Sequence, residues 1–274
     1  MRLHLHLISD STGETVTTVA RAAVSQFEDV ESIEHIWFFV RSATQLENIL
    51  DIIQDHPGLV VYTLISPELR HRLQERCRQL NQPCVPVLDS VMNALTELVG
   101  TAGRPVVGRQ HEMDEDYFSR IEAMDFAMRH DDGLCAEELE KADIVLTGVS
   151  RTSKTPTCVY LANRGVRAAN VPLVPSGQQA SVLEQLKKPL IVGLTINPEQ
   201  LAQIRLNRQK MLGQEANLGG DYADLERIKE EVISARRMFA RNEWPEIDVT
   251  KRSVEETAAT IYQLYQARQR QRSS

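Results

Sequence analysis

The sequence predicts an α/β protein with two lobes, the first of which is a series of βα units around a parallel sheet. Short runs rich in β-branched and aromatic residues alternate with longer helical patterns up to about residue 100, and this alternation is typical of parallel sheets. A second alternation begins at the buried run Asp143–Thr147. Between the two lies Gly100–Gly108, with three glycines and one proline among few apolar residues. We therefore expect two domains, residues 1–105 and 106–274.

Four βα units are expected in the N-terminal lobe. The third helix should begin at Pro67, because Ser66 is a good N-cap residue and proline suits the first helical position. The predicted strands are Leu3–Ile8, Ile33–Val40, Leu59–Ile65 and Cys84–Leu88, and the predicted helices are Glu14–Phe27, Ala43–Gln54, Pro67–Leu80 and Ser90–Val99.

The C-terminal lobe should open with a helix over Asp116–His130, followed by a turn at Asp131–Gly133. The last helix should begin at the capping box Ser253–Glu256, and the basic end from Arg268 to Ser274 should fray. The predicted strands are Asp143–Thr147, Leu190–Thr195 and Ile247–Val249, and the remaining helices are Thr155–Asn163, a basic stretch ending near Lys210, and Tyr222–Arg241, with a loop at Gly213–Gly220.

The composition excludes several classes of protein. The chain has 31 Lys and Arg against 38 Asp and Glu, so its net charge of −7 gives no global attraction to nucleic acid or an anionic membrane. Its four cysteines form no C-x-x-C pair, which argues against zinc fingers and disulfide frameworks. The N-terminus lacks the apolar core of a signal peptide, and no apolar run reaches the roughly 18 residues that span a bilayer. We expect a cytoplasmic protein without nucleic-acid or membrane partners.

The most informative stretch is the predicted strand, turn and helix over Ile144–Thr155. The turn is Gly148-Val149-Ser150-Arg151-Thr152-Ser153-Lys154-Thr155, with Gly, Lys and Thr at the offsets of the P-loop pattern G-x-x-x-x-G-K-[ST]. Such a loop directs backbone N–H groups at phosphate oxygens, and its lysine neutralises the outer phosphates. All eight residues are therefore candidates for nucleotide binding, and Thr155 would hold Mg²⁺ through its hydroxyl. A plain strand-to-helix turn is the alternative.

Ser153 departs from the P-loop pattern, which has glycine at this position. That glycine often adopts a backbone conformation that side chains disfavour. The loop geometry at Ser153 is therefore a specific question for the structure.

A P-loop enzyme usually has a carboxylate from a neighbouring strand near its magnesium ion. The strand Leu190–Thr195 ends without an acid, whereas Asp131 and Asp132 follow His130 just upstream of the loop. Two carboxylates beside an imidazole can hold a metal, accept a proton, or do both. We predict that His130, Asp131, Asp132 and Lys154 are the catalytic residues. A helix-ending turn with Gly133 in the left-handed conformation is the alternative for this segment.

Other polar segments have both a functional and a structural interpretation. The turn Ser9–Thr15 can offer hydroxyls and amides to a second phosphate-like anion or simply cap a helix. Arg205, with Arg208 and Lys210, can clamp a phosphoryl group or form a solvated helix face. His4 and His6 share a strand face without evident partner ligands, so we expect no metal there. Cys158 is expected to serve packing rather than reactivity.

Taken together, several segments resemble one protein family, the bifunctional regulators of pyruvate, phosphate dikinase and phosphoenolpyruvate synthase. The blocks that carry the resemblance are spread over most of the chain in a fixed order, which is more specific than any single motif. They are Ile8–Thr15 (ISDSTGET), Asp125–Gly133 (DFAMRHDDG), Asp143–Tyr160 (DIVLTGVSRTSKTPTCVY), Ala168–Pro175 (AANVPLVP) and Gly193–Arg205 (GLTINPEQLAQIR).

The resemblance implies a serine/threonine protein kinase that takes its phosphoryl group from ADP. It also implies a reverse activity in which inorganic phosphate removes the group and pyrophosphate is released. The implied target is a threonine beside the catalytic histidine of the dikinase, whose modification inactivates that enzyme. By resemblance, the ADP site is the loop Gly148–Thr155 of a P-loop kinase-like C-terminal lobe. The resemblance also implies a homodimer.

Three alternatives remain at this stage. ISDSTGET favours the dikinase over phosphoenolpyruvate synthase as the target, but the synthase would be regulated by the same chemistry. A P-loop small-molecule kinase would use the same loop with a lid helix. A non-catalytic module would bind the nucleotide only to order a surface.

Overall fold

The computed structural model describes residues 1–101, 103, 106–107, 115–173, 178–212 and 222–273. The chain forms two compact units, Met1–Glu112 and Met113–Ser274. Residue 105, at which the predicted first domain ends, lies outside the described residues. The predicted loop at Gly213–Gly220 lies outside them as well. Each unit is an α/β structure with its own four-stranded parallel sheet. The α/β class is as the sequence predicts, but the sequence predicts four strands in the first unit and only three in the second.

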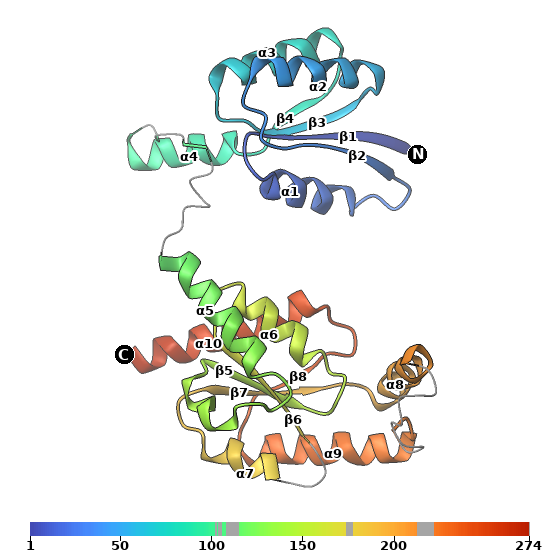
Figure 1. Ribbon diagram of the computed structural model, residues 1–274, viewed down its shortest axis with the longest axis vertical. Helices are drawn as coiled ribbons and strands as arrows, with labels where there is room; N and C mark the ends of the chain where they lie inside the picture. The colour runs from blue at the N-terminus through green and yellow to red at the C-terminus, as the bar shows by residue number, and fades with distance from the viewer. Residues whose placement is uncertain (102, 104–105, 108–114, 174–177, 213–221, 274) are drawn as a thin grey trace. The chain divides into compact units, whose positions relative to one another are not determined.

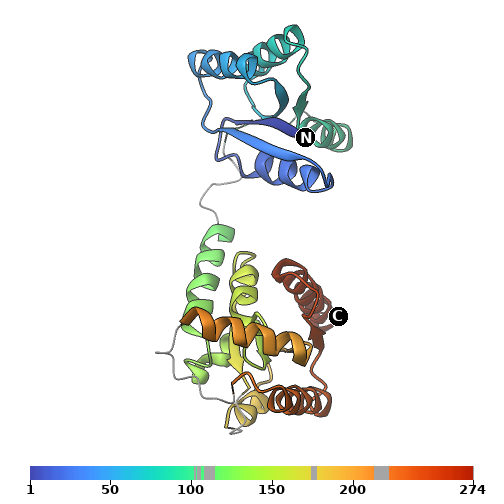
Figure 2. The same ribbon diagram turned by 90° about the vertical axis from the view of Figure 1, so that its right-hand side faces the viewer.

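The N-terminal unit has the sheet order β2-β1-β3-β4. Helices α2 and α3 cover one face of the sheet and α1 covers the other (Figure 1), and the view turned by 90° shows the same layers (Figure 2). The strands are β1 (Arg2–Ser9), β2 (Glu31–Trp37), β3 (Gly58–Thr63) and β4 (Cys84–Pro86), and the helices are α1 (Glu14–Val24), α2 (Ala43–Asp55), α3 (Pro67–Gln79) and α4 (Asp89–Val99). All eight elements were predicted, with ends that differ by a few residues.

The two faces of β1 show why this segment forms a central strand. Leu5 and Leu7 pack against Val16 and Ala20 of α1, whereas Ile8 packs with the apolar residues of α2 and α3. This alternation buries both faces of the sheet, as expected for parallel strands covered by helices. Proline at the start of α3 follows Ser66, whose hydroxyl accepts from the Leu69 N–H.

Four histidine rings lie together in the N-terminal unit. In the parallel register His6 lies beside His35, and their rings stack with centroids 4.6 Å apart. His4 contacts both His35 and His56, and its Nδ1 lies 2.9 Å from the His35 Nε2. His6 is fully buried, with Nε2 donating to the His56 carbonyl at 2.8 Å. The sequence analysis found no partners for His4 and His6 because His35 and His56 come from other elements.

The C-terminal unit repeats the same pattern of strand order, β6-β5-β7-β8. Helices α5, α6 and α10 lie on one side of the sheet, and α7 and α9 lie on the other (Figure 1). The strands are β5 (Ile144–Gly148), β6 (Ala168–Pro172), β7 (Leu190–Thr195) and β8 (Glu246–Asp248), and the helices are α5 (Glu115–Arg129), the 3-10 helix η2 (Ala136–Lys141), α6 (Lys154–Ala162), α7 (Gln178–Gln185), α8 (Pro198–Leu212), α9 (Leu225–Arg241) and α10 (Val254–Ser273).

Three elements of this unit, β6, η2 and α7, were not predicted, and the predicted fraying of the C-terminus is wrong. Helix α10 continues to Ser273 because its basic residues find acceptors. Arg268 donates to the Pro189 carbonyl at 2.6 Å, and Arg272 donates to the Lys188 carbonyl at 3.1 Å. The capping box at Ser253 and Glu256 is confirmed, since each side chain accepts from the other's backbone N–H. No helix within the described ranges is both long and apolar enough to cross a bilayer.

Candidate functional site

The loop after β5 has a backbone that only some residues tolerate. Gly148 has φ of 146°, and a Cβ there would lie 2.3 Å from the Leu194 carbonyl oxygen of the adjacent strand, so a larger residue does not fit. Ser153 is left-handed, with φ of 59°, and its side chain makes no capping hydrogen bond to α6. The serine therefore occupies the conformation for which the P-loop pattern has glycine, at a cost of about 1–2 kcal/mol.

Lys154 begins α6 and is 5% exposed, which is unusual for a lysine. Its Nζ donates to the Gly148 carbonyl at 3.1 Å and to the Val149 carbonyl at 2.9 Å. Burial lowers the pKa of Lys154 to about 8, although the negative charges of Asp132 and Asp131 oppose this shift. The loop thus encloses an ammonium group whose partners are carbonyls of the loop itself.

Two carboxylates lie beside this loop. Asp131 accepts from the Thr155 hydroxyl at 2.8 Å and from the Asn170 amide nitrogen at 2.6 Å. The same amide nitrogen lies 3.1 Å from Asp132 Oδ1 and 3.1 Å from Thr155 Oγ1. Asp132 is exposed and has a left-handed φ of 51°. The turn before η2, the strand β6 and the start of α6 therefore place Asp131, Asp132 and Thr155 together.

The His130 side chain packs in the core and has no hydrogen bond to the two carboxylates. Its ring is fully buried and stacks on Phe126 with centroids 3.8 Å apart, and its Nδ1 donates to the Phe126 carbonyl at 2.8 Å. The Nε2 atom has no hydrogen-bond partner and lies 3.8 Å from a carboxylate oxygen of Glu138. The His130 backbone nevertheless holds the carboxylate turn in place, because its carbonyl accepts from the Asn170 N–H at 3.0 Å.

Asn170 is the residue that sequence reasoning missed. It is 2% exposed, and its side chain joins both carboxylates to Thr155. Its Oδ1 atom is buried without a hydrogen-bond partner. A lone asparagine in the stretch Ala168–Pro172 carries little signal, because alanine, asparagine and proline are all weak strand formers. Only the pairing of β6 with β5, the strand that precedes the loop, shows that Asn170 lies at the site.

The remaining predicted residues have mostly structural contacts. Thr152 donates to the Val149 carbonyl at 3.1 Å, and Arg151 donates to the Tyr222 hydroxyl at 3.3 Å. Arg205 is buried and donates to Glu231 at 2.7 Å, so for this residue the interpretation as a solvated helix face is wrong. Cys158 is buried in the core, where burial raises the pKa of its thiol.

In the part of the chain that the structure describes, no group of three or more histidine, cysteine, aspartate or glutamate side chains is arranged to hold a metal ion. The cluster beside Lys154 offers two carboxylates and a hydroxyl, all of which are oxygen ligands, and the Asn170 amide nitrogen contacts all three. This composition suits a hard cation that also has ligand phosphates and waters around it, rather than a metal held by protein alone.

The fold and this cluster define an α/β protein with a lysine-bearing turn between a central strand and a helix. A family model described as kinase/pyrophosphorylase matches residues 5–262, and the chain belongs to that family. Similar proteins carry the provisional name pyruvate, phosphate dikinase regulatory protein. One from Paramagnetospirillum magneticum is 52% identical over 96% of this chain and 84% of its own length. One from Sphingopyxis alaskensis is 50% identical over 97% of this chain and 98% of its own length. The matches support a regulatory protein with kinase-type activity.

Proposed function

We propose that this chain transfers the β-phosphoryl group of ADP to an active-site threonine of pyruvate, phosphate dikinase and thereby inactivates that enzyme. The threonine oxygen attacks the β-phosphorus, the bond to the bridging oxygen breaks, and AMP leaves. In the second reaction, inorganic phosphate attacks the phosphothreonine, pyrophosphate leaves, and the threonine regains its proton. The family and the names of the relatives support this proposal. The observation that carries it is the cluster that the buried Lys154 and its neighbour Thr155 form with Asp131 and Asp132.

The residues of the cluster have different environments, which supports different roles. Lys154 supplies positive charge for the transferred phosphoryl group. Asp131 is already the acceptor for Thr155 and Asn170, so we assign it a positioning role. Asp132 is exposed and accepts only a longer contact from Asn170, which leaves it the better base for the threonine proton. His130 supports the carboxylate turn from the core.

Thr155, Asp131 and Asp132 would hold Mg²⁺ together with the phosphates of ADP. All three side chains present oxygen ligands, which suit this ion, and the Asn170 amide nitrogen holds both carboxylates in place. When bound, the ion would neutralise charge on the diphosphate. The four free cysteines fit a reducing cytoplasm, where we place the reaction.

The test is incubation with purified dikinase and ADP, followed by mass spectrometry of the active-site peptide and a measurement of AMP. Addition of inorganic phosphate should then remove the phosphoryl group with release of pyrophosphate. Lys154→Ala should reduce phosphorylation by at least roughly 10²-fold, as the loss of one electrostatic stabiliser commonly does. The exposed Lys188→Ala is the matched control, expected to retain activity. A folded Lys154→Ala protein with normal kinase activity would contradict the site.

The same assay distinguishes the other functions. Phosphorylation of phosphoenolpyruvate synthase, and not of the dikinase, would change the target but not the chemistry. AMP formation without a phosphoprotein would indicate a small-molecule acceptor, and ADP binding without AMP formation would indicate a non-catalytic module. Because the reverse reaction uses no nucleotide donor, Lys154→Ala should slow it less than the forward reaction.

A further inference from the structure

Asn170 is the residue that joins the acidic turn to β6. It pairs with Leu146 of β5 and is 2% exposed. Its backbone contacts the turn on both sides. The Asn170 N–H donates to the His130 carbonyl at 3.0 Å, and the Gly133 N–H donates to the Asn170 carbonyl at 2.8 Å. The main chain of β6 therefore holds the acidic turn at both ends, independently of the Asn170 side chain.

The oxygens around the Asn170 side chain determine its orientation. Its Nδ2 lies 2.6 Å from Asp131 Oδ1 and 3.1 Å from both Asp132 Oδ1 and Thr155 Oγ1. Ionised carboxylates can only accept hydrogen bonds, so a rotated amide would place its carbonyl oxygen against two acceptors. The amide nitrogen must therefore face the carboxylates. One uncharged side chain thus contacts both acids.

The opposite end of the same amide is not satisfied. Asn170 Oδ1 is buried and has no hydrogen-bond partner among the described residues. A buried carbonyl oxygen without a donor destabilises a fold, because its hydration is lost and nothing replaces it. An apolar residue of similar size would avoid this cost. Asparagine at this position is therefore explained by what its nitrogen does for the two carboxylates rather than by the stability of the strand.

An amide suits this position because it carries no charge. Asp131 and Asp132 are adjacent in the chain, so their carboxylates repel each other when both are ionised. A lysine or an arginine would hold them together but would also neutralise them. The Asn170 amide donates hydrogen bonds and leaves the negative charge of the carboxylates available to a cation or a proton.

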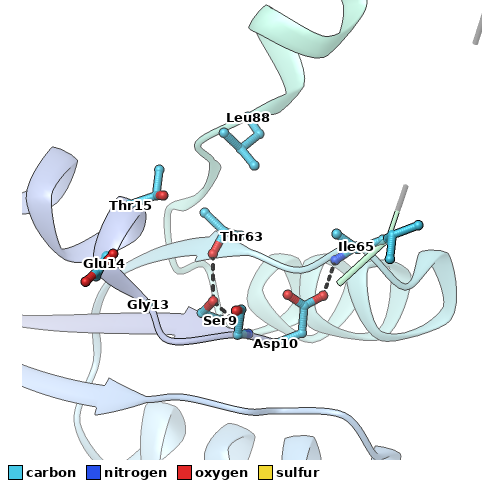
Figure 3. Close-up of a pocket in the computed structure, with 10 residues that line it drawn as sticks. Ser9, Asp10, Gly13, Glu14, Thr15, Thr63, Ile65 and Leu88 are labelled. Carbon is cyan, nitrogen blue, oxygen red and sulfur yellow. Dashed lines mark hydrogen bonds between the residues drawn. The ribbon is translucent and has the colours of Figure 1, made fainter. Parts of the chain in front are cut away.

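The N-terminal unit shows that the strand order alone does not produce this arrangement. It has the same order, and the turn after its central strand β1 lines a crevice. There Asp10 Oδ2 accepts from the Ile65 N–H at 2.6 Å, and Ser9 accepts from the Thr63 hydroxyl at 3.0 Å (Figure 3). Among the described residues that line this crevice, none is an asparagine or a lysine. The contact of one amide with two carboxylates therefore belongs to the site in the C-terminal unit.

From these contacts we infer that Asn170 is a positioning residue for phosphoryl transfer and acts through Asp132 and Asp131. This role rests on the function proposed above. In that reaction the threonine proton passes to the Asp132 carboxylate, while the threonine oxygen bonds to the β-phosphorus of ADP and the bond to AMP breaks. Because Asn170 is buried, it acts on the reaction only through the carboxylates that it holds. Its loss should slow the chemical step and leave ADP binding, which depends on Lys154, nearly unchanged.

The experiment is a double-mutant cycle on the full-length protein, with phosphorylation of the dikinase by ADP as the measured reaction. Asn170→Ala should lower kcat by roughly tenfold, as expected for loss of a hydrogen bond to a charged group, and change the KM for ADP by less than about twofold. Asp132→Asn should lower kcat by roughly 10²-fold. If Asn170 acts through Asp132, the double variant should lose little more than Asp132→Asn alone. Independent effects would instead multiply to roughly 10³-fold.

Val171→Ala is the matched control. Val171 follows Asn170 in β6, is equally buried at 2% exposed, and packs in the core cluster that contains Leu183 of α7. This variant should lower the free energy of unfolding but leave kcat unchanged, so it separates disturbance of the strand from loss of the amide. Asn170→Leu is a second test variant that fills a similar volume without polar atoms. It should unfold at no lower denaturant concentration than Asn170→Ala and show the same loss of kcat.

The outcomes distinguish this role from the proposed function. An unaltered protein that phosphorylates no threonine of the dikinase would overturn the proposed function, and the role of Asn170 with it. If the unaltered protein is active, losses that multiply in the double variant would overturn only the role of Asn170. A normal kcat in folded Asn170→Ala would do the same. Failure of both Asn170→Ala and Asn170→Leu to fold would assign this residue to the fold and equally overturn the inference.

Discussion

The Thr155 hydroxyl donates to Asp131 Oδ1 at 2.8 Å and so connects the first turn of α6 to a carboxylate 24 residues earlier. This contact means that the loop Gly148–Thr155 and the acidic turn Asp131–Gly133 are one structural unit. A change at either residue therefore alters the position of the other, even though separate elements carry them.

Substitutions of the two acids should have different effects. Asp132→Asn removes the proposed base and should lower the forward rate by roughly 10²-fold. Asp131→Asn leaves Thr155 and Asn170 with a weaker acceptor and should lower both forward and reverse rates by about tenfold. Rates are measured in both directions, with the exposed Asp116→Asn protein as the control. Normal rates in both folded variants would show that the acids are structural only.

The pKa of Lys154 predicts a pH dependence. Because burial lowers this pKa to about 8, the ammonium loses its charge as the pH rises through that value. The kcat/KM for ADP should therefore fall above about pH 8. The free energy of unfolding should instead rise with pH between about 8 and 10.5. In this range the Lys154 side chain is protonated in the unfolded state but not in the folded state. Kinetics and urea unfolding from pH 6.5 to 9.5, compared with Lys154→Arg, separate the two effects. A profile of kcat/KM that stays level to pH 9.5 would contradict the assignment.

Ser153→Gly should relieve backbone strain in the loop. The left-handed conformation at φ of 59° favours glycine, although the greater freedom of glycine in the unfolded chain offsets part of the gain. We expect unchanged or slightly higher unfolding free energy and retained or improved kinase activity. Ser153→Ala is the matched control, because it removes the hydroxyl without relieving the backbone. Loss of activity in both variants would mean that the hydroxyl contacts the ligand.

The histidine cluster should make the N-terminal unit sensitive to acid. The pKa of His6 is lowered, chiefly by burial and also by His35, His4 and His56, so the folded state binds its proton less readily than the unfolded state. Stability should therefore fall as the pH decreases below about 6.5. Denaturant midpoints at pH 7.5 and 5.5 measure this, and His35→Gln should reduce the difference. Equal midpoints for the unaltered protein would refute it.

The sequence analysis predicted most elements but not the contacts between them. Periodicity identified β5 and β7, because Ile144–Gly148 and Leu190–Thr195 are buried apolar runs. It missed β6, in which only Val171 is a strong strand former and which forms through pairing with β5. Asn170 was missed with it. His35 and His56 were not linked to His6 for a related reason, since strand register and the end of α2 bring them together.

Lys154 donates two hydrogen bonds to the carbonyls of Gly148 and Val149. These carbonyls therefore compete with any anion for the Lys154 ammonium group. An incoming anion must displace tethered acceptors that are always present at high effective concentration. Its apparent affinity would be lower than its intrinsic affinity, in proportion to the fraction of molecules in which the lysine is already released. On the proposed function, weakly charged ions would leave the lysine in place, whereas a ligand that also engages neighbouring amides would exchange for both carbonyls at once.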